Sequence, residues 1–157
     1  MSRAIFFLLL LSACIRTEVL VTRDDWTGAD VITVNEREIF RDGDAIVVVR
    51  PVIVGRGTDV LYGVLTNVRR RDANGPKIER MTAFGRNLPY RRFDRLRTHC
   101  IDGCQKAELG IITLDRESFA LAARTGLPLH IWGLRGRYDG TVPAEAFARV
   151  LARAQRS

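Results

Sequence analysis

Residues 45–54 read AIVVVRPVIV, an almost continuous apolar run. The length of this run and its β-branched residues predict a buried β-strand. Pro51 lies inside the run and cannot donate a ladder hydrogen bond, so we expect a bulge or an edge position there. The run is therefore the best candidate for a central element of the core.

Strand and turn signals alternate on both sides of this run. Asp42-Gly43 is typical of a tight hairpin, because an Asp-Gly pair readily adopts positive φ angles. Val31-Ile32-Thr33-Val34 is rich in β-branched residues, which fit a pleated surface. The further expected strands cover residues 31–34, 60–65 and 78–84, and the expected turns cover residues 41–44, 55–57 and 72–76.

Helix signals come late in the chain. Asp115 is a favourable N-cap, and Gly126 supplies the left-handed residue that ends a helix. Residues 129–132 predict one more strand, and residues 135–140 a turn. Pro143 favours the first position of a last helix. We therefore expect an α+β fold with a largely antiparallel sheet and two helices near the C-terminus.

The N-terminal segment has the form of a secretory signal. Arg3 precedes an apolar stretch at residues 4–13, and this stretch is about half the length of a membrane-spanning helix. The stretch ends in Leu11-Ser12-Ala13-Cys14. An ordinary cleaved signal with an incidental cysteine would also fit this segment.

Leu11-Ser12-Ala13-Cys14 resembles the lipobox of bacterial lipoproteins. The resemblance implies that residues 1–13 are cleaved as a signal peptide and that Cys14 is acylated and inserted in a lipid bilayer. It also implies a place in the cell envelope, facing the periplasm. Ile15 is not the aspartate associated with inner-membrane retention, which favours the outer membrane. Residues 14–29 would then be a lipidated N-terminus and tether, with Trp26 docking near the boundary, and residues 30–157 a single globular domain.

The chain is basic, with a formal net charge of +7. Lys77 and Lys106 are its two lysines among 25 basic residues, so arginine dominates, as in proteins of GC-rich genomes. At an envelope surface this charge favours anionic partners such as lipid headgroups or peptidoglycan carboxylates. A nucleic-acid partner would require a cytosolic location, which the leader argues against.

Cys100 and Cys104 are separated by Ile101-Asp102-Gly103, the pattern of a three-residue hairpin loop. In an oxidising compartment we expect these cysteines to form a cross-strand disulfide. The alternatives are a metal site made of His99, Cys100 and Cys104 with Asp102, or a redox site. Structural zinc sites show two spaced cysteine pairs and thioredoxin-like sites have two intervening residues, so neither alternative fits well.

An arginine-rich segment, Tyr90-Arg91-Arg92-Phe93-Asp94-Arg95-Leu96-Arg97, interleaves basic and apolar residues. Guanidinium groups bind phosphate and carboxylate in a planar fork. Arg91, Arg92, Arg95 and Arg97 are thus candidates for binding an anionic envelope ligand. A solvated basic face is the alternative.

No catalytic constellation and no cofactor motif can be named. Ser118 lies in the first turn of a predicted helix rather than on a nucleophile elbow. His130 lies in an apolar strand beside Trp132, where a hydrogen-bonded, half-buried histidine is the usual outcome. We therefore expect a membrane-anchored, non-catalytic protein that binds another envelope protein or an anionic polymer. An enzyme or a metal or redox protein centred on His99, Cys100 and Cys104 is the alternative.

Overall fold

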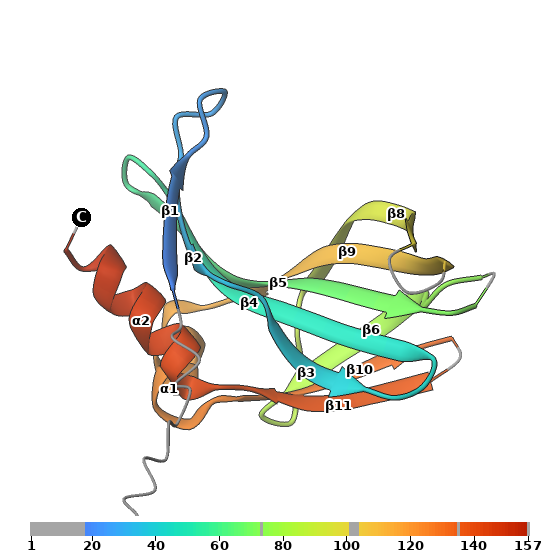
Figure 1. Cartoon of the computed structure of the whole chain (residues 1–157). Helices are drawn as coiled ribbons and strands as arrows, with labels where there is room; N and C mark the ends of the chain where they lie inside the picture. Colours follow the sequence, from blue (N-terminus) through green and yellow to red (C-terminus); the bar gives the residue numbers. More distant parts are fainter. Residues whose placement is uncertain (1–17, 73, 101–103, 135, 157) are drawn as a thin grey trace, which may run out of the picture.

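The computed structural model describes residues 18–72, 74–100, 104–134 and 136–156, with the backbone alone for residues 94–99. Two antiparallel sheets and two helices form the fold (Figure 1). The α+β class and the two late helices expected from the sequence are confirmed. Sheet A has the order β1-β2-β4-β5-β9-β8, with β3 also paired to β4, and sheet B has the order β11-β10-β6-β7.

The strands of sheet A are β1 (Val19–Arg23), β2 (Asp30–Val34), β3 (Arg37–Arg41), β4 (Ala45–Arg56), β5 (Asp59–Arg70), β8 (Tyr90–Cys100) and β9 (Cys104–Leu114). Those of sheet B are β6 (Ile78–Ala83), β7 (Arg86–Asn87), β10 (Leu127–Gly133) and β11 (Gly136–Val142). The helices are α1 (Arg116–Thr125) and α2 (Ala144–Ala154).

β4, the strand expected from the apolar run, lies at the centre of sheet A. All 12 of its residues pair with β5 along one edge. Along the other edge, β3 pairs with its first half and β2 with its second half, and the partner changes between Val49 and Val52. Pro51 lies in that interval, where neither β2 nor β3 pairs with β4, so its missing N–H costs no ladder hydrogen bond on that edge. The register with β5 is continuous at Pro51, so the position is a local edge and not a bulge.

The core lies between the two sheets and is closed at one end by the helices. Figure 1 shows β6, β10 and β11 beneath the β4, β5 and β9 part of sheet A. Phe119 of α1 lies within 5.0 Å of Phe147 of α2 and 5.4 Å of Tyr62 of β5, measured between ring centroids. Phe119 and Phe147 are fully buried, so both helices are fixed against sheet A by aromatic packing.

Local capping explains where the helices begin and end. The Asp115 carboxylate accepts a hydrogen bond from the Ser118 N–H at 2.6 Å, and Gly126 ends α1 with φ of 78°. Pro143 is the N-cap of α2, one position before the expected one. No helix among the described residues is long and apolar enough to cross a membrane.

Two segments expected outside the strands belong to them. Residues 19–23, assigned to the tether, form β1 and pair along their whole length with β2. Most β1 side chains are exposed, so the strand lacks the apolar alternation that would reveal it. Residues 136–142 form β11, although Gly136, Asp139 and Gly140 are typical of a turn. Trp26 does not dock on the domain, since its side chain is 95% exposed in the β1–β2 turn.

Gly140 allows β11 to approach β3 closely. A Cβ atom at this position would lie 2.3 Å from the Ile39 carbonyl oxygen, whereas a Cβ at Gly55 of β4 would meet nothing within 4 Å. We predict that Gly140→Ala lowers the free energy of unfolding by about 1–3 kcal/mol, the usual cost of overpacking. Gly55→Ala is the matched control and should be close to neutral. Urea denaturation of both variants measures the difference, and equal losses would contradict the proposed close approach.

Candidate functional site

Sheet A has one face toward the core and an opposite face that we call the outer face. Directly opposed residues of antiparallel strands share a face, so the pairing registers define the rows of side chains across it. One outer row runs Arg50–Leu65–Ile111–Arg91, across β4, β5, β9 and β8. Two apolar residues therefore lie between two arginines.

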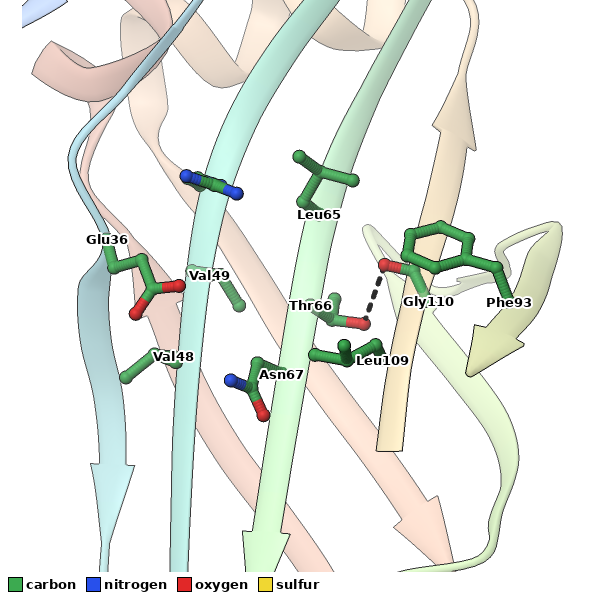
Figure 2. Close-up of a pocket in the computed structure, with 10 residues that line it drawn as sticks. Glu36, Val48, Val49, Leu65, Thr66, Asn67, Phe93, Leu109 and Gly110 are labelled. Atoms are coloured by element: carbon green, nitrogen blue, oxygen red, sulfur yellow. Dashed lines mark hydrogen bonds between the residues drawn. The ribbon is translucent and has the colours of Figure 1, made fainter. Parts of the chain in front are cut away.

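A small hollow beside this row, which we call the outer pocket, has a volume of about 100 Å³. Figure 2 shows Phe93 of β8 on one side and Glu36 of the β2–β3 connection on the other, with Leu65 and Asn67 between them. Val48, Arg50 and Leu109 also line the pocket. Pockets for drug-sized ligands are about 300–1,000 Å³, so this one suits a single side chain or functional group.

The two arginines near the outer pocket differ in their partners. Arg69 lies 3.8 Å from the Glu36 carboxylate and, in the amide orientation that satisfies both groups, donates to the Asn67 oxygen at 3.1 Å. Arg50 is partly buried, and no hydrogen bond or ion pair joins it to another described residue. A partly desolvated guanidinium without an anion can readily donate hydrogen bonds to a carboxylate or phosphate.

The arginines of β8 have different surroundings, although the sequence grouped them together. Arg91 is exposed and opposite Ile111, on the outer face. Arg92 is opposite Gly110 on the core face, where its Nε donates to Glu108 at 2.8 Å and its Nη2 to the Ile78 carbonyl at 3.1 Å. Arg92 thus has an internal partner. The side chains of Arg95 and Arg97 lie outside the described residues.

Glu108 is a buried carboxylate that the sequence reasoning missed. It is 2% exposed and accepts hydrogen bonds from the Ile78 N–H at 3.2 Å and the Tyr90 hydroxyl at 3.0 Å, in addition to Arg92. Ile78 belongs to sheet B, so these bonds join the two sheets. A signal existed in the sequence, because Glu108 falls in phase with the apolar core residues Ile112 and Leu114 on β9.

Tyr90 completes this polar group. Its ring lies against Gly110, where a Cβ atom would be 2.3 Å from the ring. Burial raises the pKa of the Tyr90 phenol, and the neighbouring Glu108 carboxylate raises it further. The phenol therefore stays protonated and keeps donating to Glu108. The whole group holds β8 and β9 on sheet B and supports the outer pocket from behind.

The expected disulfide between Cys100 and Cys104 is confirmed. The two residues are directly opposed across β8 and β9, with Cα atoms 4.2 Å apart. Paired sulfurs offer no thiolate to a metal. Within the described residues, no group of three His, Cys, Asp or Glu side chains is placed to hold a metal ion. The His99 side chain and Cys14 lie outside the described residues.

His130 lies on the solvent face of sheet B and is hydrogen bonded, as the sequence suggested. Its Nδ1 is 2.8 Å from the Asp139 carboxylate, which also accepts from Arg137 at 2.7 Å. The guanidinium groups of Arg80 and Arg137 make cation–π contacts with the Trp132 ring, at 4.2 and 5.0 Å from its centroid. These contacts join neighbouring strands of sheet B across its solvent face.

The outer pocket is thus the arrangement best suited to recognition. It combines an apolar surface, an exposed aromatic ring and a guanidinium without an ion-pair partner among the described residues. No protein-family model, curated protein or solved structure matches the chain.

The contribution of the Glu108 group to stability can be tested by substitution. We predict that Glu108→Gln lowers the free energy of unfolding by about 2–4 kcal/mol, because the change leaves Arg92 without its anion against the core. Glu79→Gln is the matched control, since Glu79 is an exposed residue on β6. Chemical denaturation measures both variants, and a Glu108→Gln protein as stable as the control would contradict this role.

Proposed function

We propose that this chain is a bacterial envelope lipoprotein, anchored through Cys14, that binds rather than catalyses. Its outer pocket takes an acidic group of a partner, either a segment of another envelope protein or a carboxylate-bearing polymer. The observation that carries the proposal is Arg50, a partly buried guanidinium without an ion-pair partner among the described residues.

The surroundings of Arg50 favour a carboxylate flanked by apolar groups. Leu65 and Leu109 offer apolar contact, and Phe93 is 54% exposed at the side of the pocket. Arg91, in the same row as Arg50, adds a second positive charge. Because Arg69 is already engaged by Glu36 and Asn67, Arg50 and Arg91 are the cations that a ligand would meet.

Membrane attachment suits a site of this size. A pocket that holds one group gives modest affinity by itself, and fixing the protein to a membrane raises its effective concentration near other envelope components. The Cys100–Cys104 disulfide supports an oxidising compartment. It also favours binding over the metal alternative at the same hairpin, because it leaves neither sulfur as a thiolate.

The anchor can be tested through Cys14. We predict that Cys14→Ser abolishes incorporation of labelled palmitate and releases the protein from membranes in a flotation gradient, because the hydroxyl cannot form the thioether of the lipid anchor. A variant with Cys100 and Cys104 both changed to Ser is the control and should float like the natural protein. Unchanged flotation of the Cys14→Ser protein would contradict a lipid anchor.

The pocket can be tested with defined peptides. We predict that the full-length protein in detergent micelles binds acetyl-Leu-Glu-Leu-amide more tightly than its Gln counterpart. Arg50→Gln should lower the affinity for the Glu peptide by about tenfold, because a charge-assisted hydrogen bond contributes about 1.5–3 kcal/mol. Arg116→Gln on α1 is the matched control. Isothermal titration measures the affinity of both peptides for the natural protein and the two variants, and equal affinity of the natural protein for the Glu and Gln peptides would contradict the proposed ligand class.

A further inference from the structure

The end of sheet A farthest from sheet B carries a second unusual surface, which we call the hairpin tip. It comprises the β1–β2 turn at residues 24–29 and the β4–β5 turn with the first residues of β5. Figure 1 shows both turns projecting from the body beside each other. An open hollow of about 590 Å³ is lined by residues of both, including Thr27 and Val60.

Trp26 is held outward at this tip by an ordered turn. The Asp24 carboxylate accepts from the Trp26 N–H at 3.0 Å and from the Thr27 hydroxyl at 2.8 Å. The Gly28 N–H donates to the Asp24 carbonyl at 2.7 Å, with the Gly28 φ at 69°. The Thr27 hydroxyl and the Trp26 N–H lower the pKa of the Asp24 carboxyl, so the turn stays fixed at neutral pH. A preorganised and fully exposed tryptophan is an anchor for another surface.

Apolar exposure is concentrated around Trp26. Among the described residues, five of the eight exposed large hydrophobic side chains lie on the tip or on the adjoining β1, namely Leu20, Val21, Trp26, Val60 and Leu61. Four of them lie on β1 or β5, and Trp26 lies in the turn between β1 and β2, so all five are exposed where the sheet extends past the core. Their clustering marks a contact surface.

The chain length before β1 limits how far this surface can be from the proposed anchor. The Glu18 carbonyl accepts from the Asn35 N–H at 3.3 Å, which fixes Glu18 to the domain. Cys14 precedes Glu18 by four residues, which span at most about 14 Å when extended. The five residues of β1 span about 16 Å. The acylated cysteine would therefore lie within roughly one strand length of β1.

We propose that the hairpin tip inserts Trp26 into the headgroup layer of the same membrane that holds the lipid anchor, with the free edge of β1 along the surface. This inference rests on the proposed lipidation of Cys14. Tryptophan favours the interface between headgroups and acyl chains, and stable attachment commonly combines two signals. The lipid anchor would be the first signal and the hairpin tip the second.

The charges of the tip select the kind of membrane. Negative charges outnumber positive ones at the hairpin tip and in the residues next to it. Four carboxylates (Asp24, Asp25, Asp30 and Asp59) face two guanidinium groups (Arg23 and Arg56). An anionic surface would repel this excess of negative charge. A zwitterionic bilayer, such as one of phosphatidylcholine or phosphatidylethanolamine, is therefore the favoured surface.

The test uses the fluorescence of each tryptophan in turn. Lipidated protein carrying Trp132→Phe, which keeps Trp26, is reconstituted into phosphatidylcholine vesicles with or without brominated acyl chains. Lipidated protein carrying Trp26→Phe, which keeps Trp132 on sheet B, is the control. We expect bromine to quench Trp26 at least about twofold and to leave Trp132 nearly unchanged, because only the hairpin tip would enter the bilayer. Added phosphatidylglycerol should reduce the quenching of Trp26.

Flotation of the same vesicles separates the two proposals. Protein that floats while Trp26 is unquenched, or is quenched no more than Trp132, would overturn insertion of the tip and leave the lipid anchor standing. Stronger quenching on addition of phosphatidylglycerol would overturn the choice of a zwitterionic surface. Protein that does not float would overturn the anchor and, with it, this inference.

Discussion

The continuous register between β4 and β5 is the constraint on which the other elements depend. It fixes 12 residues of each strand side by side, so β4 has only its other edge left to offer. β3 and β2 share that edge on either side of Pro51, and β9 pairs with the far edge of β5. The same pairing sets the rows of the outer face and carries the β4–β5 turn past the core. Both proposed contact surfaces therefore follow from one long hairpin.

A buried carboxylate, Glu108, fixes how the two sheets lie against each other. Glu108 lies where the alternation of β9 calls for an apolar side chain, and it accepts hydrogen bonds from β6 and β8. Removing these partners would leave a carboxylate in the core, which is costly. The group is therefore more specific than apolar packing alone, because it fixes which strand of sheet B lies behind β8. It also directs Arg92 inward, while Arg91 remains on the outer face.

The sequence predicted the elements that have their own local signal. Each of these elements is predicted by a signal within a few residues. They are the apolar run of β4, the caps of α1 at Asp115 and Gly126, and the cysteine pair. β1 and β11 were missed because their strands are held by pairing and by close approach rather than by an apolar pattern. The outer pocket could not be predicted, since Arg50, Leu65 and Phe93 come together only through the register of four strands. Arg91 and Arg92 face opposite sides of the sheet because they are adjacent in one strand, and the sequence does not show which of them faces the core.

The irregular course of β8 has a consequence for how copies of the chain can meet. β8 is an edge strand of sheet A, and its register shifts twice, between Arg92 and Asp94 and between Asp94 and Arg97. Unpaired edges invite strands of other molecules, and natural sheets deter them with bulges and charged side chains. The exposed Arg91 beside the two register shifts of β8 combines both devices. Copies of the chain would then be deterred from joining their sheets at this edge, which opposes fibril-like association.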